Sequence, residues 1–395
     1  MSDRFDVLIA GSGIVGLALA ASLKSRLCDA VSVCICDPGP PIMVEGQRAS
    51  AIAPDGVRLL RACGAWESVE PLAQPIFSMH VSDSRPDDKT APVFLNFGAQ
   101  PGATTPLAHM VHHHDLNRIL RARCVGNNVQ FCSDRVERFS LFRETIRAET
   151  TGGAAHAAKL LVAADGSRSS LRAQAGITTV GWSYKQAAIV ATLQHDHDHC
   201  GQAFEHFLPA GVFAVLPMPG NRSSIVWTEQ SEIAERIVRL SPEDFRAELQ
   251  RRLAGRMGSF DVIGRPASFP LTLQIARSFT ARRFALAGDA AHVIHPLAGQ
   301  GLNLGLRDAA ALAGAVQSAM ALGLDPGADT VLHGYQSDRR AESFALAGLT
   351  DSLNRLFSND IAPIRMLRDL GLGLVERSPS LKRFLMHAAT DGLAR

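Results

Sequence analysis

Two stretches decide the fold: Asp6-Val7-Leu8-Ile9-Ala10-Gly11-Ser12-Gly13-Ile14-Val15-Gly16 near the start of the chain, and Phe284-Ala285-Leu286-Ala287-Gly288-Asp289-Ala290-Ala291-His292 past its middle. Each begins with a short apolar run that is typical of a buried strand, and each run leads into glycine. After Gly16, apolar side chains recur at helical spacing, which places the first glycines at a strand-to-helix turn. Because open parallel sheets bind ligands at the carboxyl ends of their strands, both stretches predict one ligand cleft.

The spacing of the first glycines indicates a site for a pyrophosphate. Gly11 permits the tight turn, Gly13 lets the backbone approach the anion, and Gly16 allows the helix to pack closely on the strand. Ile14 and Val15, between the glycines, are further expected cofactor contacts, and the free amides at the helix start carry partial positive charge toward the anion. An ordinary tight turn is the alternative for glycines considered alone.

An acidic residue and a basic residue follow at informative positions. Asp37 ends a second apolar run, residues 31–36, about 20 residues after the glycines, where dinucleotide-binding folds hold a ribose diol. Its charge argues against a 2′-phosphate on that ribose. Arg48 lies in a polar segment, where its guanidinium could contact phosphate or adenosine oxygens; a solvated surface arginine is the alternative.

A third strand candidate, residues 160–164, runs into Asp165 and Gly166. The Asp-Gly pair predicts a turn, and Ser169 or Ser170 could cap the helix that follows. We include Asp165 among the expected cofactor contacts.

The second stretch predicts the other half of the same ligand. Gly288 and Asp289 follow their strand directly, and Asp289 is expected to hold a ribityl hydroxyl. A long helix then opens within residues 299–303, where backbone amides can meet a phosphate or a flavin pyrimidine edge. The pyrophosphate and ribityl sites together describe FAD. The expected contacts in this last segment are Pro296, Gly299, Gly301, Leu302 and Asn303.

These motifs resemble the single-component FAD-dependent aromatic hydroxylases, the group that includes 4-hydroxybenzoate hydroxylase, and most of all the ubiquinone-biosynthesis hydroxylase family. The resemblance rests on the glycine motif, Asp165-Gly166, residues 288–292 and residues 295–305. Two further family-like stretches are Glu205-His206-Phe207-Leu208-Pro209-Ala210-Gly211 and Asn354-Arg355-Leu356-Phe357-Ser358-Asn359.

The resemblance implies that reduced flavin reacts with O2 to give a C4a-hydroperoxide, whose distal oxygen is transferred to a carbon of a phenol ring. The electron donor is NAD(P)H or a small redox protein. The flavin carries the chemistry, so no protein nucleophile is expected. His295 is the nearest candidate for ionising the phenol; a structural histidine bound to a backbone carbonyl is the alternative.

The implied substrate is a polyprenylated phenol on the way to ubiquinone, and other ubiquinone-biosynthesis proteins are possible partners. The chain has only two tyrosines, Tyr184 and Tyr335, so a relay of several tyrosines does not carry over, which favours a larger, more apolar substrate. Residues 112–117 also lack the glutamine or glutamate often found there. A hydroxylase of a small aromatic acid and a non-catalytic flavoprotein scaffold remain as alternatives.

Composition sets the remaining bounds. The 395 residues carry a formal net charge of +2 with interspersed charges, which gives no indication of nucleic-acid binding. Seven cysteines occur without a CxxC pair, which favours a reducing, cytoplasmic compartment. We expect no cleaved leader before the first strand, and no apolar run reaches the ~18 residues that span a bilayer.

The order of the motifs predicts an α/β protein with a discontinuous Rossmann-like FAD-binding domain, residues 1–74, 103–178 and 278–346. Residues 75–102 and 179–277 are expected to form a mostly antiparallel sheet over the flavin. Strand-like runs there include residues 93–97, 187–193, 212–216 and 224–227.

The remaining segment, residues 347–395, is expected to be helical. Residues 361–395 mix apolar and basic side chains, which suits peripheral docking on a membrane surface or on a partner; packing against the flavin domain is the alternative.

Alternating histidines at positions 195, 197 and 199 invite a zinc or copper interpretation, as does the run at 112–114. Interleaved acids and the position between two expected strands favour a solvated loop instead, so we expect no metal site.

Overall fold

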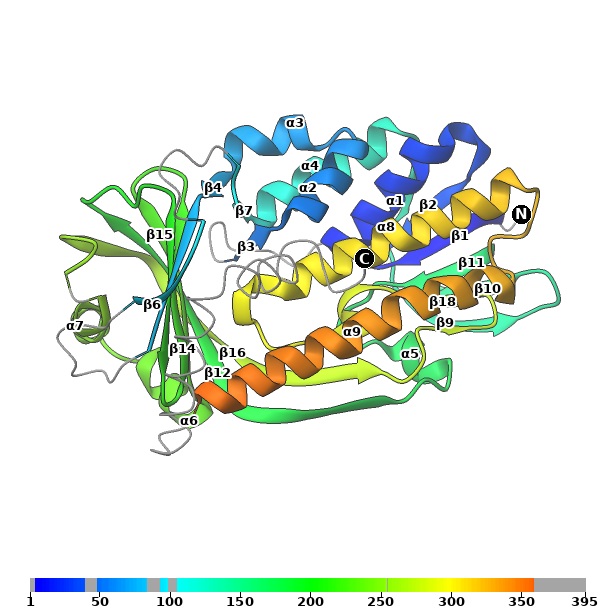
Figure 1. The fold of residues 1–395 in the computed structure, drawn as a ribbon. Helices are drawn as coiled ribbons and strands as arrows, with labels where there is room; N and C mark the ends of the chain where they lie inside the picture. Colours follow the sequence, from blue (N-terminus) through cyan, green and yellow to red (C-terminus); the bar gives the residue numbers. More distant parts are fainter. Residues whose placement is uncertain (1–3, 40–47, 84–92, 99–104, 254, 359–395) are drawn as a thin grey trace.

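The computed structural model describes residues 4–39, 48–83, 93–98, 105–253 and 255–358. Figure 1 shows two regions: a mixed helix-and-sheet layer structure that contains the N-terminus, and a large sheet at the other end of the molecule. Long helices and long strands run between the two regions.

The first sheet is parallel at its centre. Its strand order is β17-β18-β11-β1-β2-β8, and β9 and β10 extend it as an antiparallel hairpin from β11. Ala10 pairs with both Cys36 and Ala163, and Ala163 pairs with Leu286, so four strands end at one level. The strand bounds are β1 Arg4–Ala10, β2 Val33–Cys36, β8 Gln130–Cys132, β9 Val136–Leu141, β10 Ile146–Thr150, β11 Ala155–Ala163, β17 Thr280–Ala281 and β18 Phe284–Leu286.

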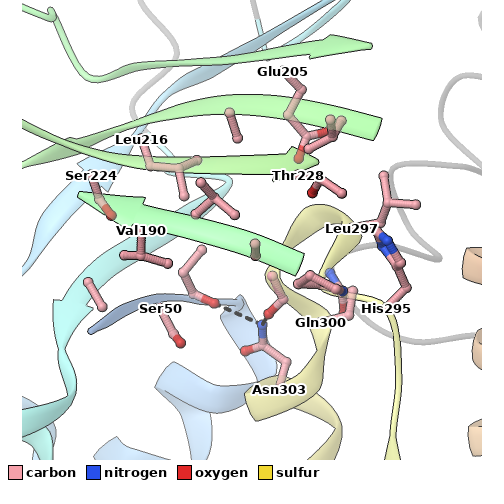
Figure 2. Close-up of a pocket in the computed structure, with 18 of the residues that line it drawn as sticks. Ser50, Val190, Glu205, Leu216, Ser224, Thr228, His295, Leu297, Gln300 and Asn303 are labelled. Atoms are coloured by element: carbon pink, nitrogen blue, oxygen red, sulfur yellow. Dashed lines mark hydrogen bonds between the residues drawn. The ribbon is translucent and has the colours of Figure 1, made fainter. Parts of the chain in front are cut away.

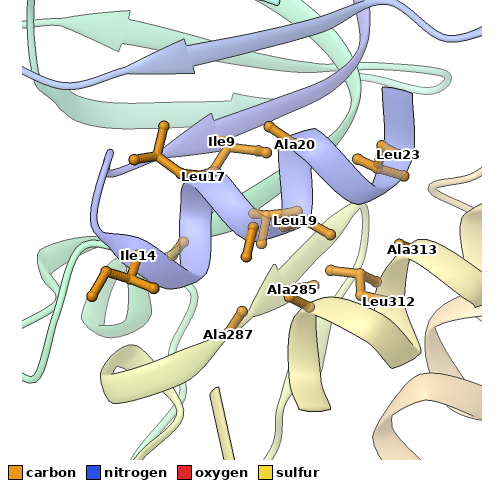
Figure 3. Close-up of a cluster of buried hydrophobic side chains, with 14 of the residues drawn as sticks. Ile9, Ile14, Leu17, Leu19, Ala20, Leu23, Ala285, Ala287, Leu312 and Ala313 are labelled. Atoms are coloured by element: carbon orange, nitrogen blue, oxygen red, sulfur yellow. The ribbon is translucent and has the colours of Figure 1, made fainter. Parts of the chain in front are cut away.

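Helices bury the central strands, which explains why these strands are apolar on both faces. Helix α1 packs against α8, and Figure 3 shows Leu19 of α1 facing Leu312 of α8. Alanines at positions 20 and 313 belong to the same buried cluster, and such small side chains allow close packing. The helix bounds are α1 Ile14–Leu27, α2 Pro54–Ala62, α3 Trp66–Val69, α4 His113–Gly126, α5 Ser170–Gln174, α8 Gln300–Ala321 and α9 Asp329–Phe357.

The second sheet has the strand order β19-β16-β12-β15-β14-β13-β5-β6, and its pairs are antiparallel except β13 with β5. Trp227 packs with Phe245 and Leu249 in a buried cluster formed with α6 and α7. The bounds are β5 Ser78–Asp83, β6 Val93–Phe97, β12 Thr179–His195, β13 Gln202–Leu208, β14 Gly211–Met218, β15 Arg222–Gln230, β16 Phe260–Ala276, β19 His292–Val293, α6 Ser231–Ile237 and α7 Pro242–Leu253.

A small sheet, β3-β7-β4, lies between the two regions. Its strands are β3 Ala49–Ile52, β4 Gln74–Ile76 and β7 Ala108–His112. Short 3-10 turns complete the chain: η1 Cys28–Ala30, η2 Glu70–Leu72, η3 Gly288–Ala290 and η4 Leu297–Gly299.

The predicted α/β class, with a Rossmann-like sheet, a mostly antiparallel second sheet and a helical end in α9, is confirmed. The four strand-like runs lie within β6, β12, β14 and β15. The docking segment at residues 361–395 lies outside the described residues.

Candidate functional site

The three glycines of the first motif occupy different surroundings. A Cβ at Gly11, whose φ is +113°, would lie 2.3 Å from the carbonyl oxygen of Ala164. A Cβ at Gly16 would lie 2.2 Å from the carbonyl oxygen of Gly11, whereas a Cβ at Gly13 meets nothing within 4 Å. Gly11 and Gly16 therefore let the turn pack against β11 and α1, and Gly13 faces the space that a pyrophosphate needs.

The amino end of α1 presents free amides beside that space. Gly13 is the N-cap residue and offers no side-chain cap, and Ile14 is the first helical residue. Val15 packs against the second motif, since a Cβ on Gly288 would lie 3.1 Å from its side chain. The two motifs that identified the fold thus meet at the start of α1.

Two polar side chains hold the glycine turn in shape. Asp37 accepts hydrogen bonds from the amides of Ser12 at 2.6 Å and Gly39 at 2.8 Å. The Nδ2 of Asn117 donates to the carbonyl oxygen of Ser12 at 2.9 Å. Asp37, which we expect to bind the ribose of the cofactor, therefore also holds the glycine turn in shape. The sequence did not predict this role of Asn117, because residues 112–117 were considered only for a glutamine or a glutamate.

The Asp165 turn lies against the second motif. Burial raises the pKa of Asp165, and its Oδ1 is buried with no hydrogen-bond partner among the described residues. An unsatisfied buried carboxylate oxygen suits a ligand hydroxyl donor. Arg172 donates to the carbonyl oxygens of Ser167 at 2.9 Å and Ala290 at 2.8 Å, and so ties the two turns together. Ser169 caps α5 through the Arg172 amide.

A buried cluster of charged and polar side chains, centred on Asp308, holds the Gly288 turn in place. The Oδ2 of Asp308 accepts the Gly288 amide at 3.0 Å and lies 2.6 Å from Nε2 of His292, while Arg339 donates to its Oδ1 at 2.8 Å. Burial alone would raise the pKa of Asp308, but His292 and Arg339 outweigh it and lower that pKa. The sequence did not predict these roles, because Asp308 and Arg339 lie in helices whose pattern does not separate buried charged residues from solvated ones.

Asp289 projects from this turn as an accessible side chain. Desolvation by the surrounding protein raises its pKa, while His292 and Arg48 oppose part of that rise. Arg48 also lies over the Phe269 ring, 5.6 Å from its centroid, and lines a cavity of about 450 Å³ that is described below. The structure therefore places Arg48 beside the expected ligand space.

The segment before α8 contributes backbone and one bridging amide. Gly299 has φ +63° and is the N-cap of α8, so the amides that follow, including those of Gly301 and Leu302, begin the helix. Asn303 uses its side chain internally: its Oδ1 accepts the Ala53 amide at 2.8 Å, and its Nδ2 donates to Ala51. The side-chain amide of Asn303 is therefore already hydrogen-bonded. Asn303 can still contact a ligand because it forms part of the cavity wall (Figure 2).

His295 lies in the cavity wall and is 1% exposed. Burial lowers its pKa to about 4, against the opposing effect of Asp351. Neither ring nitrogen has a hydrogen-bond partner among the described residues, so the alternative of a histidine held by a backbone carbonyl is not observed there.

A cavity of about 450 Å³ lies between the second sheet and the start of α8. Its wall is mostly apolar, as Figure 2 shows for Val190, Leu216 and Leu297. Polar side chains are few and include Ser50, Glu205 and Thr228. Pro296 belongs to the same wall, so the predicted flavin-facing segment and the second sheet share one cavity.

The histidines at positions 195, 197 and 199, at the end of β12 and in the turn after it, are not all solvated, which corrects our expectation of a solvated loop. His195 is buried and its Nε2 lies 2.9 Å from Ser223 Oγ. His199 is buried with Nε2 2.9 Å from the carbonyl oxygen of Met218, and its Nδ1 accepts the Gly201 amide at 3.0 Å. Both rings act as structural hydrogen-bonding groups because this turn folds back onto the sheet.

The comparisons with known proteins agree with this geometry. The family model described as FAD binding domain matches residues 4–347. The chain is 43% identical over 395 residues to ubiquinone hydroxylase UbiL of Rhodospirillum rubrum, covering 98% of this chain and 90% of that protein. The chain belongs to the ubiquinone-biosynthesis hydroxylase family of FAD-dependent aromatic monooxygenases.

Further relatives extend this result. The 3-demethoxyubiquinol 3-hydroxylase of Escherichia coli is 31% identical over 384 residues, with 96% of each chain covered. The crystal structure of p-nitrophenol 4-monooxygenase PnpA from Pseudomonas putida has the same fold, with a TM-score of 0.80 at 19% identity over 100% of both chains.

This family member is an FAD-dependent monooxygenase, and its residues fit FAD. The glycine turn leaves open space only at Gly13, and Asp165 offers an unsatisfied buried oxygen. Bound FAD supplies the oxygen-activating chemistry, with O2 as co-substrate. None of the helices in the described part of the chain is both long and apolar enough to cross a bilayer.

Proposed function

We propose that this enzyme hydroxylates the aromatic ring of a polyprenylated phenol in ubiquinone biosynthesis, with electrons from NAD(P)H or a small redox protein. The observation that carries the proposal is the apolar cavity where the second sheet meets the start of α8. Such a wall suits a prenylated ring better than a free acid. Two of the relatives carry ubiquinone or ubiquinol in their names.

Each predicted contact has a proposed task. The turn at Gly11, Gly13 and Gly16, with the amides of Ile14 and Val15, binds the pyrophosphate. Asp37 and Arg48 contact the adenosine half. Asp165, Gly288 and Asp289 hold the ribityl chain, and the segment containing Pro296, Gly299, Gly301, Leu302 and Asn303 positions the flavin ring.

The apolar wall orients the substrate ring and excludes water, which protects the oxygen-transferring state from decay. His295 is the proposed proton acceptor for the phenol, because its low pKa keeps the imidazole neutral at pH 7.

We also propose that the domain division follows the expected bounds, with residues 75–102 and 179–277 forming the substrate side.

A small aromatic acid fits the site less well. A carboxylate would need a basic partner, and among the described lining residues Arg48 is the one guanidinium. Arg48 already interacts electrostatically with the carboxyl of Asp289. This arrangement argues for a substrate without a carboxylate.

Two measurements test the proposal. Metabolite analysis of a deletion strain should reveal an accumulated prenylated quinone precursor, which would also name the ring position. The purified holoenzyme should consume O2 with NAD(P)H faster when a prenylated phenol is present. Normal quinone levels in the deletion strain would reject the proposed pathway.

We propose a cytoplasmic enzyme that meets its lipid substrate at the membrane surface through residues 361–395, which lie outside the described residues. A chain truncated before Ser378 should keep FAD but lose co-sedimentation with anionic vesicles. Equal vesicle binding by the full and truncated chains would reject this docking role.

A further inference from the structure

His295 in the cavity wall has two polar side chains near it, those of Tyr184 and Asp351. The Tyr184 ring packs edge-on against the His295 ring, with centroids 5.1 Å apart and an interplanar angle of 87°. The Asp351 carboxylate is close enough to both residues to perturb their ionisation. Tyr184 comes from β12 and Asp351 from α9, while His295 precedes α8. Three separate elements thus bring one imidazole, one phenol and one carboxylate together.

The polar atoms of this group are incompletely satisfied. Both ring nitrogens of His295 are buried without a hydrogen-bond partner in the described part of the chain, whereas the Tyr184 hydroxyl interacts with the Asp351 carboxylate. Buried polar atoms without partners are rare in folded proteins and call for an explanation. His295 lies in the wall of the cavity beside Leu297, so its two unsatisfied nitrogens belong to the cavity wall (Figure 2).

Exposure rises from the cavity outward. His295 is 1% exposed, the Asp351 side chain is 14% exposed, and the Arg355 side chain is 64% exposed. Arg355 Nε lies 2.9 Å from Oδ2 of Asp351, and its guanidinium lies over the Trp182 ring. The group therefore extends from the buried cavity wall to an exposed residue of α9.

The end of α9 is fixed against the second sheet, so this arrangement is not a chance approach of a loose helix. Asn354 donates to Oε1 of Gln186 on β12 at 3.1 Å. Phe357 stacks on Phe207 of β13 with ring centroids 4.0 Å apart. Asp351 lies about one turn before Asn354, so it belongs to the part of α9 that these contacts fix.

The acid-base properties of His295 require a further acceptor. Burial lowers the pKa of His295 to about 4, and Asp351 partly offsets that effect. Burial and the nearby Asp351 carboxylate raise the pKa of Tyr184, so its hydroxyl stays protonated. An imidazole with so low a pKa takes up a proton only transiently, and the proton must move on for the phenol to remain ionised.

We propose that Asp351, together with the Tyr184 hydroxyl, completes a proton path from the substrate cavity to solvent. The O–H bond of the bound phenol breaks as one nitrogen of His295 receives the proton, and the other nitrogen gives up a proton toward Asp351. The Asp351 carboxyl then releases it to water beside Arg355, so the proton count closes with phenolate in the cavity. Asp351 acts through His295 and is a positioning and relay residue; Tyr184 orients the pair. This inference rests on the proposed phenol hydroxylation.

The holoenzyme with 4-nitrophenol as a coloured probe tests the path, because phenolate formation is visible by absorbance after rapid mixing. In Asp351→Ala the rate of phenolate formation should fall about 10-fold or more, while the dissociation constant of the probe stays within about twofold. Formate should restore the rate in proportion to its concentration, since a small acid can replace a lost relay carboxylate. Asp351→Glu should retain most of the rate.

Asp338→Ala is the matched control, since Asp338 is an exposed acid on the same helix α9 and should leave the rate unchanged. If Asp351→Ala fails to fold, Asp351→Asn and Tyr184→Phe take its place, and both should slow phenolate formation. A parental rate in the Asp351 variants, or a slow rate that formate does not restore, would overturn the path.

Hydroxylation by the unmodified enzyme separates this inference from the proposed function. An enzyme that hydroxylates no prenylated phenol removes the proposed function and the inference that depends on it. If the parent enzyme hydroxylates a prenylated phenol but Asp351→Asn has the parental rate and an unshifted pH profile, the proposed function stands and only the proton path is rejected.

Discussion

The glycine turn and the substrate cavity are built from different parts of the polypeptide. At Gly11, Gly13 and Gly16 the shape depends on backbone atoms and on the absence of Cβ atoms. The cavity depends on side-chain volumes contributed by strands that are far apart in the sequence, such as β3, β12 and β14. We therefore expect a change in the first region to affect folding or cofactor binding, and a change in the second to affect the choice of substrate.

The largest effect is expected from Gly11→Ala. Its Cβ would lie 2.3 Å from a backbone oxygen at φ +113°, so both contact and conformation are unfavourable. We expect a loss of about 3 kcal/mol or more in the free energy of unfolding of the apoprotein. Gly13→Ala is the control: it meets nothing within 4 Å, so it should leave urea unfolding unchanged and weaken only FAD binding. Equal destabilisation by both changes would contradict the different tasks of these glycines.

His113 lies where the two regions meet, and it predicts a pH dependence. Its Nε2 lies 2.7 Å from Ser50 Oγ, and burial together with Arg48 and His112 lowers its pKa to about 4. The unfolded chain binds the proton near pH 6.5, so the contribution of His113 is complete above about pH 6.5 and is lost as the pH falls toward 4. The loss is on the order of 3 kcal/mol. In His113→Gln the decline of unfolding free energy over this range should be shallower, and an unchanged slope would contradict the prediction.

A smaller effect separates two acids of the cofactor site. Asp289→Ala should raise the dissociation constant of FAD roughly 10-fold to 100-fold, because a hydrogen bond to a charged group contributes about 1.5 to 3 kcal/mol. Asp165→Ala should weaken FAD less, since Asp165 acts partly through its turn. Titration of apoprotein with FAD measures both. Unchanged affinity in Asp289→Ala would remove the ribityl role of this turn.

Asp37→Ala tests whether a cofactor contact is also structural. Because Asp37 accepts the Ser12 and Gly39 amides, we expect the variant to lose FAD affinity and also some apoprotein stability, about 1 to 3 kcal/mol. Parental FAD binding would leave Asp37 as a strand-end residue.

The sequence was most informative where backbone geometry restricts residue choice. The strand-glycine-helix order of residues 6–16 and the second motif at residues 284–292 predicted the parallel sheet and its aligned strand ends. Asn117, Asp308 and Arg339 could not be found this way, because each acts by reaching a backbone group or charge far along the chain. A side chain in a helix has no local pattern that distinguishes such a partner from solvent.

The smallest effect is expected from a change of side-chain volume in the cavity wall. It tests whether the cavity controls the choice of substrate. Ala214 of β14 is a small buried residue in the cavity wall, so Ala214→Leu should reduce the space for a prenyl chain without touching the glycine turn. We expect FAD affinity to stay parental, and kcat/KM for a long-chain prenylated phenol to fall roughly 10-fold, while a short-chain phenol is hardly affected. Gly314→Ala on α8, where an added Cβ meets nothing within 4 Å, is the control for a methyl group added away from the cavity. Equal losses for long and short substrates would mean that Ala214 controls the position of the ring rather than the space for its chain, because only a volume effect depends on chain length.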